Sequence, residues 1–408
     1  MLILTHHYPP EVGAPQTRLS ETAVFLKSRG HDVSVVTALP SYPTGVIPPS
    51  YRGRVVCAEL IDAIPVVRTW TYAKPGSSAR LRLANQLSFA LSAPLALARI
   101  GKRDVVLVES PPLFLGPTGA LFARLLRAPL VLHVSDLWPA VPIQLGALRN
   151  HSLIWMAERF ERIVYALAER LIVVTQVWAD QLVSQGVPAA KISLVTNGAD
   201  PDFLDPAASA GERERLRSEL ALEGNTAFIC LGTVSTVYDY ELILRAAKKL
   251  AARSDLRFLI VGDGSQAPML RDQVAELGLS NVRLLRAQPR QRARGLLAAA
   301  DISMTPIRPL PVTAGQLPVR VLEAMAMARP VLLAGRGEAR KLVEESGAGI
   351  AVDPGDAEAF TEALVRLSSD AKLRDEMGAR GREAILARFS RSQVAEGIER
   401  ALLTAVGF

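Results

Sequence analysis

Residues 227–264, AFICLGTVSTVYDYELILRAAKKLAARSDLRFLIVGDG, decide the fold that this sequence predicts. An apolar run ends at Gly232, a helical pattern covers 241–253, and a second apolar run, 258–261, ends at Gly262-Asp263-Gly264. Apolar strands that alternate with helices are typical of a parallel sheet covered by helices on both faces.

The same alternation runs through most of the chain. Further strands are expected at residues 2–5, 33–37, 66–70, 105–109, 130–134, 171–175 and 192–195, and then at 282–285, 302–305, 331–334 and 349–352. The charged stretch 205–223 is interpreted as a linker plus a solvated helix. We therefore predict an α/β fold of two facing Rossmann-like domains with parallel sheets, at 1–198 and 199–375. Helices at 376–408 should pack back toward the first domain. Ligands bind at the carboxyl ends of parallel strands, so a nucleotide and its reaction partner could meet across the cleft between the domains.

Composition narrows the class of protein. The chain has 408 residues, 49% of them hydrophobic, which suits two domains of ordinary size. The formal net charge is +7, and all of that excess lies in residues 1–157, with 15 basic against 8 acidic residues. Aromatic residues make up 5%, too few for a nucleic-acid stacking surface, so no nucleic-acid partner is expected. Cys57 and Cys230 stand in apolar runs and are expected to be buried strand residues in a reducing compartment. The first ten residues lack the features of a signal peptide.

A mean hydropathy of +0.21 calls for a search for membrane segments. Residues 87–100 form the longest candidate, but this stretch contains Pro94 and is shorter than the roughly 20 residues that a span needs. Basic residues flank it on both sides: Lys74, Arg80, Arg82, Lys102 and Arg103. A helix lying in the surface of an anionic membrane leaflet is one interpretation, and a buried crossover helix is the other.

A loop leading into a helix, residues 315–326, is the main candidate for an anion-binding site. Gly315, Gln316 and Leu317 precede Pro318, which suits the first turn of a helix. Free amides at a helix start bind anions, so a diphosphate could lie there, with Arg320 as a bidentate donor. Glu323 could accept hydrogen bonds from ribose hydroxyls. The alternative is that Glu323 is simply a solvated helix residue.

Glycines at two strand ends extend the same candidate site. Gly232 with Thr233, and Gly262 with Gly264, form turns of the kind found next to phosphate or ribose. Asp200-Pro201-Asp202 resembles a metal-binding DxD pattern, but its position favours a turn and helix cap, and no metal is expected.

The first domain carries a second group of candidates. Gly13 lies in the loop after the first strand and would give backbone access to a ligand, and Arg18 opens the following helix. His133 and Asp136 lie three residues apart at the end of another strand, where they could orient a hydroxyl or a developing charge. A structural histidine is the alternative. GxSxG, HExxH, Walker A and CxxC motifs do not occur.

These residues resemble the family 4 retaining glycosyltransferases of the GT-B fold. The resemblance covers nearly the whole chain. It rests on HYPPEVGAPQTRLSE, LPSYPTGVIPPSYRGR, SDLWP, NGAD and LPVRVLEAMAMARPVLLAGRGEARKLVEESGAGIAVDPGD. The first two pieces are similar to a subgroup of N-acetylfucosamine or fucose transferases of O-antigen, capsule or colanic-acid assembly.

The resemblance implies metal-independent, cofactor-free transfer of a sugar from a nucleotide-diphosphate donor, UDP-linked by expectation, with retention of configuration. It places Glu323 at the ribose, Arg320 and Gly13 near the phosphates, and His133 or Asp136 near the sugar. The family's first motif glutamate is replaced by Gly315, and its usual Arg and Lys are absent after Gly232. Arg320, Arg290 or Arg292 could supply the missing charge.

Three functions remain open from the sequence. The first is a glycosyltransferase, peripheral on the cytoplasmic face of the plasma membrane, that acts on a lipid-linked saccharide. The second is a UDP-sugar 2-epimerase of the same fold, and the third is a nucleotide-sugar-binding scaffold whose catalytic set has decayed. Donor sugar, nucleotide base, acceptor and linkage depend on a few side chains that the sequence does not identify.

Overall fold

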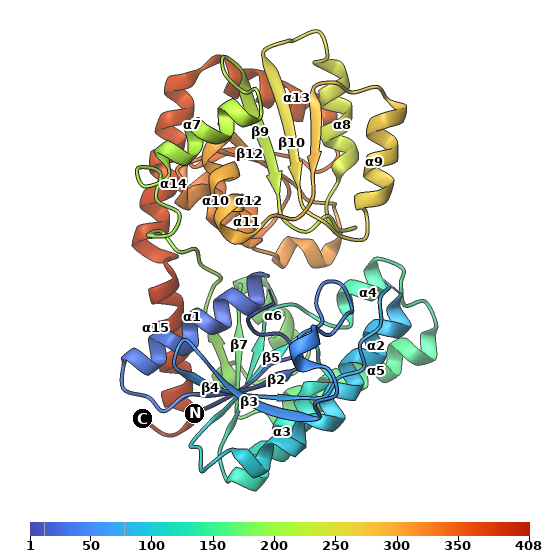
Figure 1. Cartoon of the computed structure of the whole chain (residues 1–408), viewed down its shortest axis with the longest axis vertical. Coiled ribbons are helices and arrows are strands. Elements are labelled where there is room, and N and C mark those ends of the chain that lie inside the picture. Colours follow the sequence, from blue (N-terminus) through green and yellow to red (C-terminus); the bar gives the residue numbers. More distant parts are fainter. Residues whose placement is uncertain (12, 77) are drawn as a thin grey trace. The chain divides into compact units, whose positions relative to one another are not determined.

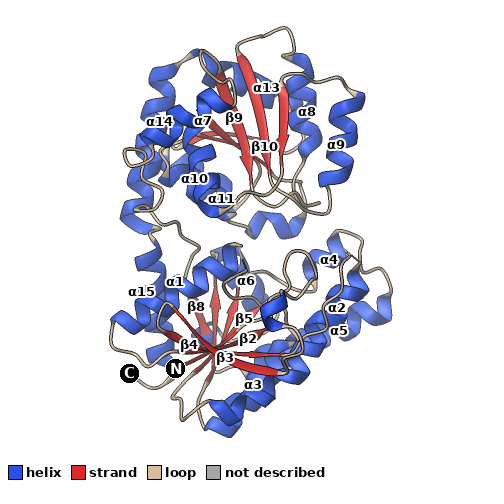
Figure 2. Ribbon diagram, in the orientation of Figure 1, coloured by secondary structure: helices blue, strands red, loops and turns tan. Residues whose placement is uncertain are grey.

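A computed structural model of the chain describes residues 1–11, 13–76 and 78–408 and divides it into two compact units. Unit 1 comprises Met1–Thr196 with Arg391–Phe408, and unit 2 comprises Asn197–Ser390. In each unit a sheet lies between layers of helices (Figure 1), as the colouring by secondary structure makes plain (Figure 2). The predicted pair of Rossmann-like units is confirmed.

The described part of unit 1 holds an eight-stranded sheet in the order β3-β4-β2-β1-β5-β6-β7-β8. Its strands are β1 (Leu2–Leu4), β2 (Ser34–Ala38), β3 (Val56–Ile61), β4 (Ile64–Thr69), β5 (Val106–Ser110), β6 (Leu130–Val134), β7 (Arg170–Val173) and β8 (Ile192–Leu194). Its helices are α1 (Ala14–Ser28), α2 (Ala79–Ser92), α3 (Leu115–Leu126), α4 (Ala140–Gln144), α5 (His151–Leu167), α6 (Gln176–Ser184) and α15 (Arg391–Ala405), with short 3₁₀ turns η1 (Pro49–Tyr51), η2 (Ala93–Arg99) and η3 (Ala189–Lys191).

The described part of unit 2 holds a six-stranded parallel sheet in the order β11-β10-β9-β12-β13-β14. Its strands are β9 (Thr226–Leu231), β10 (Leu256–Val261), β11 (Val282–Leu285), β12 (Ile302–Pro306), β13 (Val331–Ala334) and β14 (Gly349–Val352). Its helices are α7 (Ala210–Glu219), α8 (Tyr240–Lys249), α9 (Ala267–Glu276), α10 (Arg290–Ala299), α11 (Val319–Ala326), α12 (Glu338–Ser346), α13 (Ala357–Ser369) and α14 (Ala371–Arg388), with the 3₁₀ turn η4 (Pro311–Gly315).

Apolar side chains cover both faces of each sheet. In unit 1, alternate residues of β1 point to opposite sides, so that Leu2 and Leu4 join one cluster while Ile3 joins the other. The second cluster includes Val394 and Ile398 of α15, which lies beside α1 on that face. Strands buried on both faces must be apolar throughout, which is why they could be recognised from the sequence. The predicted tail is divided, since α14 belongs to unit 2 and α15 to unit 1.

The sequence predicted a wholly parallel sheet in unit 1. This prediction is wrong at one edge, because β3 pairs with β4 in the antiparallel sense. Asp62 and Ala63 connect these strands with φ angles of 50° and 61°. A two-residue hairpin turn of this kind needs positive φ at both positions and usually contains glycine. The missing glycine explains why β3 was overlooked. Cys57 in β3 and Cys230 in β9 are buried and free, as predicted.

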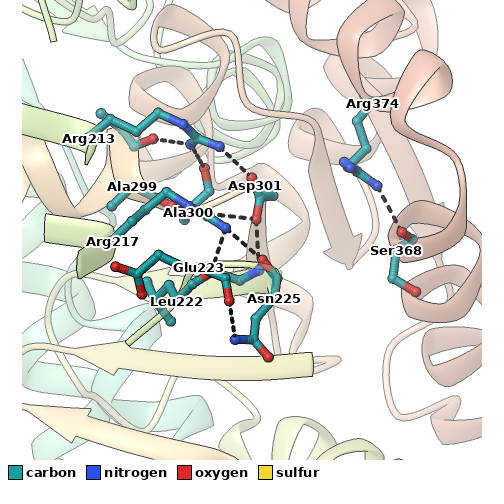
Figure 3. Close-up of polar contacts among 12 residues, drawn as sticks. Arg213, Arg217, Leu222, Glu223, Asn225, Ala299, Ala300, Asp301, Ser368 and Arg374 are labelled. Atoms are coloured by element: carbon teal, nitrogen blue, oxygen red, sulfur yellow. Dashed lines mark hydrogen bonds and ion pairs between the residues drawn. The ribbon is translucent and has the colours of Figure 1, made fainter. Parts of the chain in front are cut away.

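The segment predicted as a linker and solvated helix contains α7, most of whose residues are exposed as predicted, but it is a packed part of unit 2 rather than a linker. α7 lies against α10, and Leu216 on α7 is fully buried. Arg213 and Arg217 of α7 bind the two carboxylate oxygens of Asp301, with N–O distances of 2.7 and 3.0 Å (Figure 3). The pattern of charges on α7 therefore reflects a specific anchor and not only exposure to solvent.

Candidate functional site

Two glycine loops meet at the carboxyl edge of the unit 2 sheet, after β9 and β10. A Cβ atom at Gly262 would lie 2.0 Å from the carbonyl oxygen of Gly232, and one at Gly264 would lie 2.3 Å from that of Val234. The Val234 amide donates to the Asp263 carbonyl at 3.0 Å, which ties the loops together. Glycine is required here because the two backbones touch.

Arg320 joins this edge to α11. Its Nη2 donates to the Thr233 carbonyl at 3.0 Å, and its guanidinium lies over the Tyr238 ring, 3.7 Å from the ring centre. A Cβ atom at Gly232 would lie 2.8 Å from Nη2. Gly232, Thr233, Gly262 and Arg320 therefore form one group, as the sequence suggested, and Tyr238 is an addition. Stacking on an aromatic face holds a cation in place before any anion binds.

The loop before α11 is fixed by a buried side chain and by a hydrogen bond to its backbone. Leu317 is buried, and its carbonyl accepts from Asn197 Nδ2 at 3.2 Å. Gly315 is the last residue of η4, Gln316 follows it, and Pro318 is the N-cap of α11. Glu323 lies one turn into α11 and is half-buried. The first amides of α11 are therefore presented next to a fixed loop, which is the arrangement expected of an anion site.

Arg290 and Arg292 are engaged elsewhere in unit 2. Arg290 lies 3.5 Å from Asp200 and stacks over the Phe203 ring at 4.1 Å, while Arg292 forms an ion pair with Glu219. The predicted turn at Asp200 is confirmed, because its Oδ1 accepts from the amides of the second and third residues after it at 3.2 and 3.0 Å. The predicted helix cap is wrong, because the next helix, α7, begins only at Ala210. In the described part of the chain, no group of three or more His, Cys, Asp or Glu side chains is placed to hold a metal ion.

At the carboxyl edge of unit 1, Gly13 is the N-cap of α1. Its φ of 171° is ordinary extended backbone, and a Cβ atom there would meet the Gln16 side chain, with Oε1 at 2.5 Å. Conformation therefore does not demand glycine at this position, although a small residue keeps the start of α1 accessible. Val12, in the same motif, lies outside the described residues.

A buried polar network lies between the unit 1 sheet and α1. His133 on β6 and Glu109 on β5 stand opposite each other in register, with His133 Nδ1 2.7 Å from Glu109 Oε2. Glu109 Oε1 accepts from Ser135 Oγ at 2.7 Å and from Arg18 Nη2 of α1. The sequence proposed Asp136 as a carboxylate acting alongside His133, but Asp136 Oδ1 accepts from the next backbone amide, that of Leu137, at 3.0 Å. The carboxylate that holds the imidazole is Glu109.

In this network, burial and the neighbouring charges shift the pKa of Glu109 in opposite directions. Burial alone would raise the pKa of Glu109, but Arg18 and His133, with the hydrogen bonds from His133 and Ser135, outweigh it and hold the pKa at about 2. Burial lowers the pKa of His133, and Arg18 acts in the same direction, while Glu109 opposes both. An ionised carboxylate beside a neutral imidazole is therefore the expected state at neutral pH.

Four of the five basic residues that were predicted to face a membrane are exposed to solvent. Lys74, Arg80, Arg82 and Lys102 are exposed. Arg103 instead pairs with Asp32 at 3.1 Å and donates to Ser34 at 3.0 Å. Across the described residues, every helix is too short or too polar to cross a bilayer.

Sequence reasoning thus found the glycine loops and His133 but overlooked the role of Glu109 and the contact with Arg18. A signal was present, because the apolar runs at 105–109 and 130–134 each carry one polar side chain near the carboxyl end. Adjacent parallel strands bring such positions together. The strand order, which a single sequence does not reveal, was the missing information.

Known families match both halves of the chain. The family described as Glycosyl transferase 4-like domain matches residues 13–198, and the one described as Glycosyl transferases group 1 matches residues 212–384. The chain is a glycosyltransferase. Together the two matches span most of its length, and each falls on one structural unit apart from its boundary residues.

Curated relatives of this glycosyltransferase share about a quarter of its residues. The putative colanic acid biosynthesis glycosyl transferase WcaI of Escherichia coli is 27% identical over 307 residues, which cover 74% of this chain and 75% of that protein. The alpha-D-kanosaminyltransferase of Streptomyces kanamyceticus is 26% identical over 280 residues, covering 67% and 69% of the two chains.

Solved structures show the GT-B fold of this glycosyltransferase. Anabaena HepE, crystallised with UDP-glucose, superposes with a TM-score of 0.72 at 19% identity, covering 99% of this chain and all of that one. WaaG, a glycosyltransferase involved in lipopolysaccharide biosynthesis, gives a TM-score of 0.70 at 16% identity with both chains fully covered.

Proposed function

We propose that this glycosyltransferase transfers a deoxy-amino sugar from a UDP-linked donor to a lipid-linked saccharide during assembly of a bacterial surface polysaccharide. Transfer is retaining and independent of metal. In that reaction the bond from the anomeric carbon to the diphosphate oxygen breaks, and the acceptor hydroxyl oxygen bonds to the same carbon. The hydroxyl proton leaves with the diphosphate. The relationship to WcaI, which covers three quarters of each chain, supports the polysaccharide context.

The observation that carries the proposal is the cationic, glycine-lined edge of unit 2. Arg320 is held over Tyr238 against the backbone at Gly232, and the first turn of α11 follows the fixed loop at Leu317. A diphosphate placed there would meet the Arg320 guanidinium and the first turn of α11, both of which favour negative charge. Three crystal structures of Anabaena HepE, which has the same fold, are complexes with UDP, with UDP and glucose, and with UDP-glucose, and they support a nucleotide-sugar donor.

Thermal unfolding with UDP, GDP and dTDP tests the donor site. A nucleotide present at 100 times its Kd should stabilise the protein by about 2.7 kcal/mol, and UDP should protect most strongly. Glu323→Ala and Arg320→Met should each weaken this protection, because they remove the ribose acceptor and the phosphate cation. Glu344→Gln, at an exposed glutamate of α12, is the matched control and should behave as wild type. No protection by any nucleotide would reject the donor site.

The acceptor side of the proposal rests on an apolar face of unit 1. α2 and η2 bury one side, with Phe89, Ala93 and Ala96 in the core. Four leucines at intervals of four residues remain exposed on the other side: Leu83, Leu87, Leu91 and Leu95. The segment covers the sheet, as the crossover-helix interpretation predicted, and its exposed leucines support the membrane interpretation, which stays a prediction.

Neighbouring helices extend this face. α3 contacts both α2 and α5, and it exposes Leu121 and Leu125. α5 adds a further group of exposed apolar side chains: Leu153, Trp155, Met156, Ile163 and Leu167. Exposed arginines on the same helices could pair with phosphate headgroups: Arg124, Arg159 and Arg162. We assign this surface to an anionic bilayer that carries the lipid-linked acceptor, which makes the protein peripheral on the inner face of the plasma membrane.

Flotation with vesicles tests the membrane assignment. Wild-type protein should bind vesicles of phosphatidylglycerol and phosphatidylcholine, bind pure phosphatidylcholine less, and be partly released at high salt. Leu91→Glu and Trp155→Glu should reduce binding because they place a charge on the apolar face. Met269→Glu, at an exposed apolar residue of α9 in unit 2, is the control. Equal binding by all four proteins would reject this surface.

A further inference from the structure

The buried network of unit 1 has an asymmetric arrangement of partners around one carboxylate. Glu109 uses Oε2 for His133 Nδ1, at 2.7 Å, and Oε1 for Ser135 and Arg18. The side chains of His133 and Glu109 are only 1% and 3% exposed, so solvent cannot replace these contacts. Three elements meet here, namely β5, β6 and α1.

This arrangement determines which ring nitrogen carries the hydrogen. An ionised carboxylate can only accept hydrogen bonds, so His133 must donate from Nδ1. If the ring is neutral, its lone pair then lies on Nε2. The charged groups that act on the ring are Glu109 from β5 and Arg18 from α1, and Arg18 disfavours a second proton on the ring. Arg18 also keeps Glu109 ionised.

We infer that Glu109 is a positioning residue that holds His133 as the neutral Nδ1–H tautomer, so that Nε2 accepts a hydrogen bond from a hydroxyl of the sugar substrate. Arg18 maintains the charge of Glu109, and Ser135 fixes the orientation of the carboxylate. The inference rests on the proposed function, because it presumes that a sugar reaches His133. A carboxylate in this position selects the tautomer of a histidine in the same way that outer-shell carboxylates orient metal-bound histidines.

The first test reads the tautomer directly. The full chain is labelled with ¹⁵N-histidine, and the signals of His133 among the five histidines are assigned with His133→Gln. Wild-type His133 should show a protonated Nδ1 and an unprotonated Nε2 from about pH 6 to 8. In Glu109→Gln, whose amide can donate as well as accept, the Nε2–H tautomer should appear. A wild-type ring protonated on Nε2 would overturn the inference.

The second test reads the reaction. Glu109→Gln should lower kcat by about 10- to 100-fold and leave the donor KM within about threefold, because the carboxylate acts through His133 rather than on the donor. In a His133→Ala background, Glu109→Gln should have no further effect beyond about twofold. Independent, multiplicative losses would show that Glu109 does not act through His133 and would overturn the inference.

Two controls separate positioning from folding. Glu109→Gln leaves Arg18 buried without its carboxylate, so Arg18→Met/Glu109→Gln removes both charges and should restore the thermal midpoint without restoring kcat. Glu161 is a second buried glutamate of unit 1, hydrogen-bonded to Tyr165 on α5. Glu161→Gln should leave the His133 tautomer and kcat unchanged. If no donor is turned over, the proposed function fails, while the tautomer measurement still decides the role of Glu109.

Discussion

Replacing Asp301 with alanine should destabilise unit 2 strongly. Asp301 precedes β12 and joins three parts of the unit. One carboxylate oxygen accepts from Arg213 at 2.7 Å, and the other accepts from Arg217 at 3.0 Å and from the backbone amide of Ala227 on β9 at 2.8 Å. The two arginines come from α7, so the carboxylate connects α7 to the sheet (Figure 3).

The Asp301 side chain is 12% exposed, and removing one partner of a buried ion pair costs about 3–5 kcal/mol. The low end applies, about 3 kcal/mol, because Arg213 and Arg217 keep hydrogen bonds to backbone carbonyls such as those of Ala300 and Ala299. Burial by itself would raise the pKa of Asp301, but the Ala227 amide and both arginines lower it. Its contribution should therefore be complete at neutral pH and fade below about pH 4.

The assay can separate the two units. All four tryptophans, Trp70, Trp138, Trp155 and Trp178, lie in unit 1, so their fluorescence reports unit 1, whereas far-ultraviolet circular dichroism reports both. With a urea m-value of about 2 kcal/mol/M, Asp301→Ala should move the unit 2 transition in circular dichroism down by about 1.5 M.

Glu241→Ala is the matched control for this prediction. Glu241 forms an exposed ion pair with Arg245 on α8 of the same unit, and such exposed pairs contribute little to stability. A shift for Asp301→Ala no larger than that of Glu241→Ala would refute the reasoning. α7 would then be held by its apolar contacts, such as that of Leu216, and not by the carboxylate.

Two further predictions concern other sites. Burial raises the pKa of Glu161 to about 7, above its value of about 4.3 in an unfolded chain, so unit 1 should lose up to about 2 kcal/mol as pH rises from 5 to 7. Glu161→Gln should abolish that slope in urea titrations followed by tryptophan fluorescence, and an unchanged slope would contradict the assignment. Gly262→Ala places Cβ 2.0 Å from the carbonyl oxygen of Gly232. It should lower the free energy of unfolding by about 3 kcal/mol and abolish the stabilisation by nucleotide. Gly278→Ala, with φ of 61° and open space around it, should cost about 1 kcal/mol; similar losses for both alanines would show that loop contact is unimportant.

Most strands could be predicted from the sequence because they are buried on both faces and therefore apolar throughout. β6 and β13, whose residues are all buried, begin and end where the apolar runs do. The edge strands β11 and β14 also have the predicted bounds, although they are only partly buried. β3 was missed for the opposite reason. It is an edge strand with exposed Ala58 and Leu60, and its turn reaches positive φ without glycine. Local sequence therefore carries little of the information that forms β3.

In the candidate site, too, some residues could be predicted from the sequence and others could not. The glycines at 232 and 262 could be predicted because an apolar strand followed by glycine is a continuous pattern in the sequence. The partner of His133 did not stand out, because Glu109 lies 24 residues earlier in the chain. Asp136 was proposed because it is near in sequence, but its carboxylate binds the next backbone amide.

By itself, the sequence determined the two α/β units, the glycine loops and the apolar, basic character of the segment around α2, because each depends on the order of residues along a short stretch. Tertiary structure alone decided that Glu109 meets His133, that Arg18 covers them and that Asp301 anchors α7. Hydrogen bonds and ion pairs act over about 3 Å, so their partners are chosen by strand register and helix packing rather than by spacing in the chain.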